Sequence, residues 1–241
     1  MNTNYTTDNV VDQSFIVEPC DVSELVHNTL LNTDIKTNGS YMYVILKRFF
    51  DIVLSAIAIV VLSPLMLVVS VIIYVDDKGS PIFIQQRYTQ DGKIFKMYKF
   101  RSMYVDAEER FNEVKHLNEI DGNIIFKSKD DPRITRIGKF IRKTSIDELP
   151  QLFNILKGDM SIVGPRPPIT REVVQYTSYQ MNRLLVKGGL TCFWQCSGRS
   201  NLNFDEQVEL DIKYIKNRSL FLDFKLILKT VKTVLKMDGA S

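Results

Sequence analysis

The stretch YVILKRFFDIVLSAIAIVVLSPLMLVVSVIIYVDDKGS, from Tyr43 to Ser80, sets the strongest limit on how this chain of 241 residues can fold. No charged residue occurs from Ile52 to Val75, and those 24 residues would form a helix about 36 Å long, enough to cross a bilayer. Ser63-Pro64 falls inside the run, and an internal proline removes a helix hydrogen bond and kinks the axis. The stretch therefore predicts either a spanning helix or a broken one that returns to the side it entered.

The flanks of this run leave both alternatives open. Length alone favours spanning, and Lys47 and Arg48 favour a cytoplasmic N-terminal side. A spanning helix would place the rest of the chain outside, in an oxidising milieu. The three cysteines form no regular framework, and their odd number is typical of a reducing compartment. A helix that turns back at Ser63-Pro64 keeps both ends cytoplasmic and agrees with the cysteines.

Residues 1–40 have a different composition from the rest. They contain six acids and one lysine, are rich in Asn and Thr, and show no sustained period, which predicts a flexible acidic tail. The chain then divides into this tail, a membrane helix over 41–76 and a domain over 77–241. The formal net charge is +3, so a modest excess of cations follows the tail. That excess favours anionic small ligands or a membrane surface as partners and argues against nucleic acid.

From Pro81 onward the pattern is that of an α+β domain, mostly helical. Two short strands within 81–103, on either side of Asp91-Gly92, predict a small β-hairpin. Helices are predicted over 106–117, 170–186, 203–217 and 219–237, and two more within 130–167. In the last helix Lys225, Lys229, Lys232 and Lys236 recur opposite Phe221, Phe224, Leu228 and Val231. This basic amphipathic helix either packs on the core or lies on an anionic membrane surface.

Two acids, Asp147 and Glu148, stand side by side within KTSIDELPQLFNILKGDMSIVGPRP, from Lys143 to Pro167. Ser145-x-x-Glu148 fits a capping box, in which Glu148 would only cap a helix. Pro150 would then be the fifth helical residue, past the first turn where proline is tolerated. It also pushes the preceding residue away from helical angles. A helix that begins near Pro150, with the acids just before its N-terminus, is the competing interpretation.

Cations surround this acid pair. Arg133, Arg136, Lys139, Arg142 and Lys143 precede it, either as a solvated face or as ligands for an anion. Arg166 lies between two prolines that stiffen the backbone and orient its guanidinium, which suits phosphate binding. Carboxylates beside cations indicate phosphoryl transfer, with one acid as nucleophile and its neighbour on a metal ion. The sequence has no Walker-type glycine loop and no dinucleotide fingerprint.

Eight pieces of the sequence carry a family resemblance. In order they are KRFFDI, LSPLML, PIFIQQR, KIFKMYKFRSM, DPRITRIGKFIRKTSIDELPQLFNILKGDMSIVGPRPP, GGLTCFWQCSGRS, ELDIKYIKN and DGAS. Together they resemble the monotopic bacterial sugar transferases, the polyprenyl-phosphate hexose-1-phosphate transferases that start capsule, O-antigen and exopolysaccharide assembly. The resemblance implies that the helix is re-entrant, with its break at Ser63-Pro64. It also implies an inner-membrane protein whose catalytic domain faces the cytoplasm.

The resemblance further implies a reaction. Asp147 would attack a UDP-sugar and expel UMP, undecaprenyl phosphate would take the phosphosugar from the enzyme, and Glu148 with Asp147 would hold Mg²⁺. Other substrate-binding positions of the family match Arg142, Arg166, Arg199 and Asp211, and Lys99 and Arg101 of KFRSM as well, unless these two are structural. The ending DGAS is similar to relatives that transfer glucose- or galactose-phosphate. The family loop usually has proline at position 188 and glycine at 192, where this chain has Gly188 and Cys192.

Two rival functions remain on the sequence. A membrane-bound glycosyltransferase would transfer the bare sugar and release UDP. A membrane-anchored scaffold or regulator of polysaccharide export would have no catalytic activity. A homodimer is a further expectation about the assembly.

Overall fold

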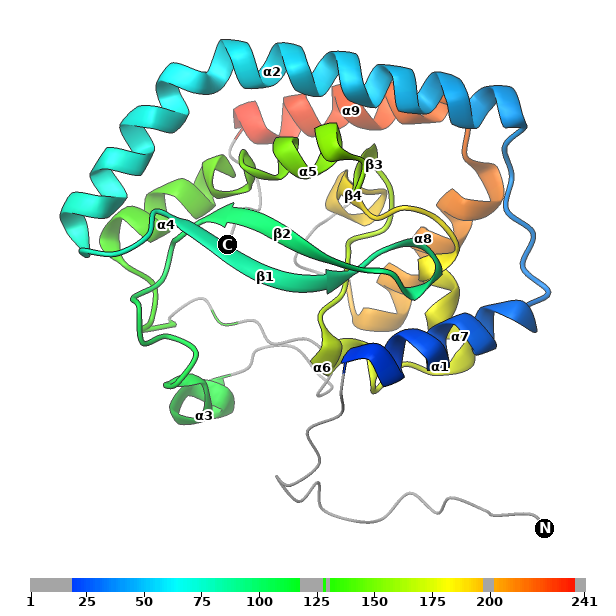
Figure 1. The fold of residues 1–241 in the computed structure, drawn as a ribbon, viewed down its shortest axis with the longest axis horizontal. Coiled ribbons are helices and arrows are strands. Elements are labelled where there is room, and N and C mark those ends of the chain that lie inside the picture. The colour runs from blue at the N-terminus through cyan, green and yellow to red at the C-terminus, as the bar shows by residue number, and fades with distance from the viewer. Residues whose placement is uncertain (1–18, 118–127, 129–130, 197–201, 237–241) are drawn as a thin grey trace.

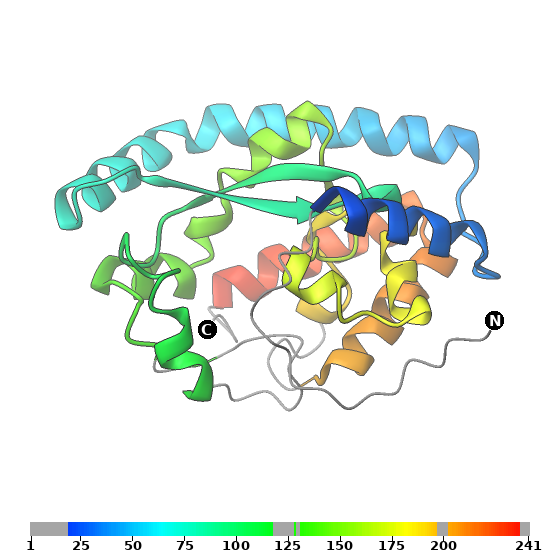
Figure 2. The ribbon, with the colours of Figure 1, turned by 60° about the horizontal axis from the view of Figure 1, so that its bottom comes forward.

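The computed structural model describes residues 19–117, 128, 131–196 and 202–236. The apolar stretch forms one long helix, α2 (Tyr41–Asp76), which Ser40 caps by accepting a hydrogen bond from the Tyr43 backbone N–H. Within the described residues, α2 is long and apolar enough to cross a membrane. It extends along one edge of the molecule and bends in its second half (Figures 1 and 2).

The break motif has a local explanation in the structure. Pro64 has no N–H to donate to the carbonyl of Val60, four residues earlier. The Ser63 hydroxyl donates to that carbonyl instead, at 2.8 Å. The serine therefore satisfies the acceptor that the proline leaves open, so α2 continues through the bend without an unpaired carbonyl in apolar surroundings.

One stripe of α2 packs on the rest of the molecule along the whole helix. Ala58 and Leu62 contact a core cluster around Met97, and Val69 and Ile73 belong to a second cluster. The opposite stripe exposes large apolar side chains. Among them are Phe49, Ile57, Val60, Val61, Leu67, Val68, Val71 and Val75. A surface of this kind is typical of a helix that contacts lipid.

The predicted β-hairpin is confirmed. Strands β1 (Ile82–Tyr88) and β2 (Ile94–Phe100) pair antiparallel, with Ile82 opposite Phe100 and Tyr88 opposite Ile94. The 3₁₀ turn η1 (Gln90–Gly92) joins them, with φ of 58° at Asp91 and 74° at Gly92. Asn, Asp and Gly tolerate this left-handed region best, which is why Asp-Gly predicts the turn.

A second, parallel pair of strands was not predicted. Strands β3 (Ser161–Val163) and β4 (Gly189–Thr191) are only three residues long, too short to leave a periodic pattern. Their glycines have a steric reason, because a Cβ added at Gly189 would lie 2.1 Å from the backbone nitrogen of Gly164. The backbones of the two loops thus approach each other as only glycine allows.

The described part of the chain is mostly helical, as predicted. The remaining elements are α3 (Phe111–Val114), η2 (Lys115–Leu117), α4 (Arg136–Lys143), η3 (Ile146–Glu148), α5 (Gln151–Lys157), α6 (Thr170–Val173), α7 (Ser178–Met181), η4 (Asn182–Leu185), η5 (Trp194–Cys196), α8 (Phe204–Asn217) and α9 (Leu220–Lys236). The single helix predicted over 170–186 is divided into α6, α7 and η4. Thr177 and Gln180 form a capping box that starts α7 afresh, so the helix cannot run through.

The flexible tail predicted for 1–40 differs from the structure over residues 19–31. This segment forms helix α1 (Pro19–Leu31), which lies across the molecule from α2 (Figure 1). Its Val22, Val26 and Leu30 recur every four residues and are buried in the main core cluster, with Tyr88 of β1. The polar composition concealed this short apolar stripe. Residues 1–18 lie outside the described residues.

The basic amphipathic helix 219–237 is confirmed as α9 over Leu220–Lys236, but its faces differ from the prediction. Leu226 faces the core, whereas Phe221 and Leu228 are 81% and 71% exposed. Residues three or four apart share a helix face, so Lys225 lies beside Phe221 and Leu228 and not opposite them. The helix thus shows solvent an apolar strip bordered by lysines, which favours the membrane-surface alternative.

Candidate active site

The acid pair lies on a tight turn before a helix. Asp147 and Glu148 belong to the 3₁₀ turn η3, and α5 begins at Gln151, directly after Pro150. Ser145 has φ of 57° and makes no side-chain cap, so the capping-box interpretation is wrong. The alternative of a helix beginning near Pro150 is confirmed. The turn holds the two carboxylates outside the regular helix, where their orientation follows from the loop.

The two carboxylates have different environments. Asp147 is 9% exposed, and burial raises the pKa of its carboxyl to about 6. Lys99 and Arg142 act in the opposite direction on that pKa, while the neighbouring Glu148 adds to the rise. Glu148 is more accessible and accepts a hydrogen bond from the Lys99 ammonium at 3.1 Å. The carboxyl of Asp147 is therefore buried and has a raised pKa, whereas the carboxylate of Glu148 is paired with a lysine.

A pocket of about 240 Å³ opens beside Glu148, the neighbour of Asp147 in the turn. It is lined by Arg87, Met97, Lys99, Glu148, Gln151, Arg166, Pro167, Gly189, Leu190 and Gln195. Among the ionisable lining residues, three are cations and Glu148 is the carboxylate, so the pocket carries an excess of positive charge. Arg166 is exposed, and no hydrogen bond or ion pair engages its side chain within the described residues. Such a pocket suits a phosphorylated ligand.

Arg142 approaches the site from α4. Its Nε donates to the Ser102 hydroxyl at 2.9 Å, and burial lowers the pKa of its guanidinium. Asp147 is close enough to counteract that shift, so the two groups interact electrostatically. The structure thus brings together Asp147, Glu148, Lys99, Arg142 and Arg166 from segments far apart in the sequence.

Two other residues that the sequence predicted to bind substrate, Arg101 and Asp211, lie away from this pocket. Arg101 donates to the backbone carbonyl of Asp77 at the end of α2, so the structural alternative describes its position. Asp211 is fully buried in α8, where its Oδ2 accepts a hydrogen bond from the Arg183 Nε at 2.8 Å and lies 2.7 Å from the Arg183 Nη2 in an ion pair. Burial raises the pKa of Asp211 to about 6 although Arg183 opposes the rise. Neither side chain faces the pocket, and Arg199 lies outside the described residues.

One pocket residue was missed on the sequence. Arg87, in β1, is 6% exposed and lines the pocket beside the GPRP turn, where it donates a hydrogen bond to the Pro167 carbonyl. A signal was available, because alternation in a strand places Arg87 and Gln85 on the same face as Lys99 of the paired strand.

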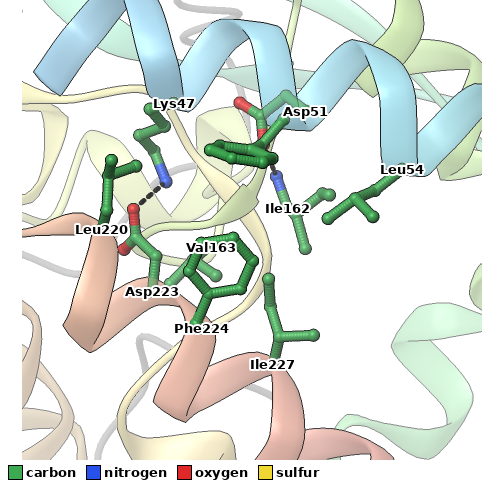
Figure 3. Close-up of a pocket in the computed structure, with 10 residues that line it drawn as sticks. Lys47, Asp51, Leu54, Ile162, Val163, Leu220, Asp223, Phe224 and Ile227 are labelled. Atoms are coloured by element: carbon green, nitrogen blue, oxygen red, sulfur yellow. Dashed lines mark hydrogen bonds and ion pairs between the residues drawn. The ribbon is translucent and has the colours of Figure 1, made fainter. Parts of the chain in front are cut away.

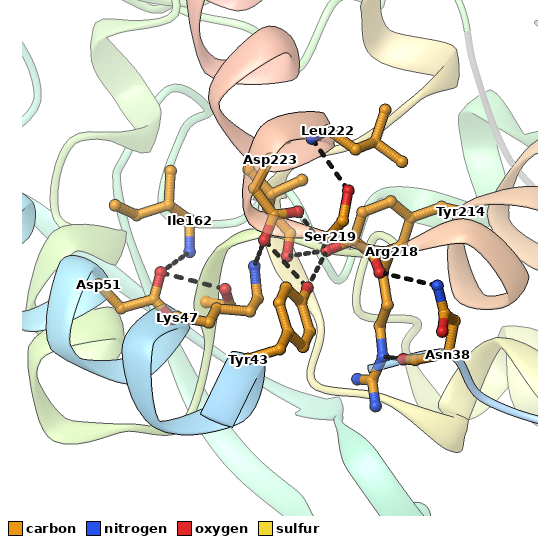
Figure 4. Close-up of polar contacts among 12 residues, drawn as sticks. Asn38, Tyr43, Lys47, Asp51, Ile162, Tyr214, Arg218, Ser219, Leu222 and Asp223 are labelled. Atoms are coloured by element: carbon orange, nitrogen blue, oxygen red, sulfur yellow. Dashed lines mark hydrogen bonds and ion pairs between the residues drawn. The ribbon is translucent and has the colours of Figure 1, made fainter. Parts of the chain in front are cut away.

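A second pocket, of about 270 Å³, lies between α2, β3 and α9 (Figure 3). Lys47 bonds Asp223 at 2.8 Å, and the Tyr214 hydroxyl donates to the same carboxylate at 2.7 Å. Asp51 accepts hydrogen bonds from Ser161 and from the backbone of Ile162 (Figure 4). These groups satisfy one another, so the cluster fastens the first half of α2 to the domain.

Comparison with known proteins shows which family this chain resembles. The family model described as bacterial sugar transferase matches residues 42–237. Galactosyl transferase CpsE of Streptococcus agalactiae is 49% identical over 204 residues, which are 83% of this chain and 44% of that protein. Undecaprenyl-phosphate galactose phosphotransferase of Salmonella typhimurium is 46% identical over 198 residues, 81% of this chain and 41% of that protein. Exopolysaccharide production protein ExoY of Rhizobium meliloti is 36% identical over 197 residues, 80% of this chain and 87% of that protein.

The chain thus spans less than half the length of the first two relatives and most of the third. The matched range contains the whole pocket and both carboxylates, whereas α1 precedes it. The family match covers most of the chain and agrees with the position of the acid pair beside a cationic pocket. The chain belongs to the bacterial sugar transferase family.

Proposed function

We propose that this protein transfers a sugar-1-phosphate from a UDP-sugar to undecaprenyl phosphate. This would be the first membrane step of exopolysaccharide, capsule or O-antigen synthesis. The observation that carries the proposal is the buried carboxylate of Asp147 beside Glu148, at a pocket with excess positive charge. Relatives named as undecaprenyl-phosphate sugar phosphotransferases, from Salmonella typhimurium and Klebsiella pneumoniae, support it.

In the first step a carboxylate oxygen of Asp147 attacks the phosphorus that bears the sugar. A bond forms between them, the bond to the bridging oxygen breaks, and UMP leaves with that oxygen and its electron pair. With a pKa of about 6, Asp147 is ionised at pH 7.5 yet more basic than an ordinary aspartate. Its carboxylate is therefore a better nucleophile, and neighbouring Lys99 and Arg142 stabilise negative charge on the reacting phosphate.

In the second step an oxygen of undecaprenyl phosphate attacks the same phosphorus. The bond to Asp147 breaks, and the carboxylate is restored as it began. One phosphoanhydride has replaced another, so the exchange needs little external drive. A covalent intermediate lets one pocket serve a water-soluble donor and a lipid acceptor in turn.

Mg²⁺ is the cofactor that we propose for this site. Within the described residues no group of three or more His, Cys, Asp or Glu side chains forms a closed metal site. Mg²⁺ is commonly held by one or two carboxylates together with substrate phosphates, and the adjacent Asp147 and Glu148 fit that kind of site. Bound there, the ion would neutralise charge on the phosphates.

For the membrane we propose a re-entrant α2 in the inner membrane, with the domain on the cytoplasmic side. Both ends of α2 contact the same domain, through Lys47 with Asp223 at one end and Arg101 with Asp77 at the other. A helix that left its domain to cross a bilayer would not make both contacts. The exposed apolar stripe of α2 and the lysine-bordered strip of α9 would then contact lipid.

The sugar that we propose is glucose or galactose. Relatives are named for galactose, for glucose and for N-acetylgalactosamine, so donors of all three kinds belong in the test. A homodimer remains a prediction.

The decisive experiment measures UMP release by detergent-purified protein with Mg²⁺ and a panel of UDP-sugars, before any lipid acceptor is added. A burst near one UMP per enzyme with one sugar would support the covalent route and identify the donor. Asp147→Asn, nearly isosteric, should abolish the burst. UDP as the product would indicate bare-sugar transfer, and no product with any sugar, with or without undecaprenyl phosphate, would favour the non-catalytic scaffold.

A further inference from the structure

Arg87 has an unusual position for an arginine. It lies near the end of β1, its side chain is almost fully buried, and it lines the same pocket as Lys99, Glu148 and Arg166. Its Nε and Nη2 donate to the side-chain oxygen of Gln85 at 3.0 Å and 2.7 Å, and its Nη1 donates to the carbonyl of Pro167 at 2.8 Å. A guanidinium has five N–H groups, so two remain for another acceptor.

The partners of Arg87 orient it without neutralising it. Both acceptors, an amide oxygen and a backbone carbonyl, are uncharged. Two other buried arginines have carboxylate partners. Arg133 pairs with Asp131 and Arg183 pairs with Asp211, each at 2.7 Å. No carboxylate within the described residues forms such a pair with Arg87. A buried charge that no carboxylate pairs with directly is costly, so a ligand that supplies negative charge would stabilise it.

A second cation, Arg166, adds positive charge near Arg87. Burial lowers the pKa of the Arg87 guanidinium to about 10, and nearby Arg166 adds to that fall, while Glu172, Tyr176 and Glu148 oppose it. Arg166 itself is exposed and has no side-chain partner among the described residues. Two arginines that line one pocket and repel each other are both stabilised by an anion bound there.

We propose that Arg87 binds a phosphate group of the substrate together with Arg166, and that Gln85 and the Pro167 carbonyl hold its guanidinium in position for this. The proposal rests on the proposed function, because it takes the pocket to be the one that receives phosphorylated substrates. The phosphate belongs either to the nucleotide donor or to the lipid acceptor, which present the same chemistry.

The test compares three variants of the full chain in detergent. Arg87→Gln removes the charge. Gln85→Glu keeps the guanidinium but supplies a carboxylate that pairs with it, so the fold should be at least as stable while the charge is cancelled. The control is Lys96→Gln, which makes the same charge change as Arg87→Gln on the exposed, opposite face of the hairpin.

Binding of UDP is measured by titration calorimetry, KM for undecaprenyl phosphate by UMP release, and the fold by thermal unfolding. We expect Arg87→Gln and Gln85→Glu each to weaken UDP binding at least tenfold, with Lys96→Gln within twofold of the parent. A tenfold rise in KM for the lipid phosphate with UDP binding unchanged would assign Arg87 to the acceptor.

The two hypotheses fail separately. If Gln85→Glu is folded and both its UDP affinity and its KM for the lipid phosphate equal those of the parent, Arg87 only supports the GPRP turn and the inference is overturned. The inference is also overturned if the parent protein binds neither UDP nor undecaprenyl phosphate. If UDP binding depends on Arg87 but no UDP-sugar gives UMP, the phosphate site stands and the proposed transferase reaction falls.

Discussion

The carboxyl of Asp147 is both buried and more basic than that of an ordinary aspartate. The η3 turn buries the carboxyl, and the pKa rises to about 6 in spite of nearby Lys99 and Arg142. An aspartate at the surface would ionise fully at neutral pH but would be a weaker nucleophile. Glu148, adjacent in the chain, is paired with Lys99 instead, so one short turn gives the two acids different environments.

The raised pKa of Asp147 predicts the pH dependence of the first step. Below pH about 6 the carboxyl becomes protonated and cannot attack phosphorus, so the rate of UMP release should fall nearly tenfold per pH unit. Single-turnover release measured from pH 8 to pH 4.5 checks this, with thermal unfolding at each pH as the control for loss of fold. A rate that stays constant down to pH 5 would contradict the assignment of Asp147 as nucleophile.

The same shift predicts that Asp147→Asn stabilises the protein. The folded state holds the proton more tightly than the unfolded state, whose pKa is near 3.8, so that stabilisation is present below 3.8 and lost as pH rises through about 6. Asparagine never ionises, and the variant should gain about 1–3 kcal/mol at pH 7.5 and almost nothing at pH 3.5.

Thermal unfolding in detergent at both pH values measures this gain. The matched control is Glu148→Gln, which removes a neighbouring charge that is more exposed and paired with Lys99, and should change stability by at most about 1 kcal/mol. An Asp147→Asn protein that is less stable than the parent at pH 7.5 would mean that attraction by Lys99 and Arg142 outweighs the cost of burial.

At the scale of elements, α1 is the clearest difference between sequence and structure. It packs on the end of β1, where the Tyr88 hydroxyl donates to the Pro19 carbonyl at 3.1 Å and Ser23 donates to the Gly92 carbonyl at 2.7 Å. Tyr88 is the residue after Arg87. The helix thus supports the strand that carries part of the pocket, although it precedes the range that the family model matches.

Shortening a buried side chain of α1 should therefore lower the stability of the domain. Val26 is fully buried, and Val26→Ala should cost about 2 kcal/mol in the free energy of unfolding through lost apolar contacts and a small cavity. Leu25, the preceding residue, is 50% exposed, and Leu25→Ala should cost less than about 0.5 kcal/mol. Thermal unfolding of both variants compares them, and equal stability would place α1 outside the cooperative fold.

At the scale of the whole molecule, the arrangement of α2 decides on which side of a membrane the domain lies. Its ends contact one domain while its outer stripe is apolar, which fits a helix that enters the bilayer and returns. Length and composition alone favour a spanning helix, because the 24 uncharged residues from Ile52 to Val75 are enough to cross a bilayer.

Removing the break should change the topology. In Ser63→Ala/Pro64→Leu the helix regains its backbone hydrogen bond and loses the reason to bend. We expect a reporter fused after Ser241 to be cytoplasmic in the parent and to move to the outer side in a substantial fraction of the double variant. The control Ser70→Ala removes a hydroxyl of the same helix that bonds the Met66 carbonyl, and should leave the topology unchanged. An external reporter in the parent would overturn the re-entrant arrangement.

The sequence by itself determined the features that depend on neighbours in the chain. These are the long apolar helix, the hairpin at Asp91-Gly92, the start of α5 after Pro150 and the adjacency of Asp147 and Glu148. Each follows from local sterics, hydrogen bonding or periodicity, which act within a few residues. The ordered motifs also sufficed to recognise the family.

Only the tertiary structure decided which distant residues meet. It brings Arg87 to the pocket, directs Arg101 to the end of α2 and buries Asp211 against Arg183. It also pairs β3 with β4 and docks the polar-looking α1 on the core. These outcomes depend on which surfaces become buried together, and burial is settled by contacts between segments tens of residues apart, which no local pattern records.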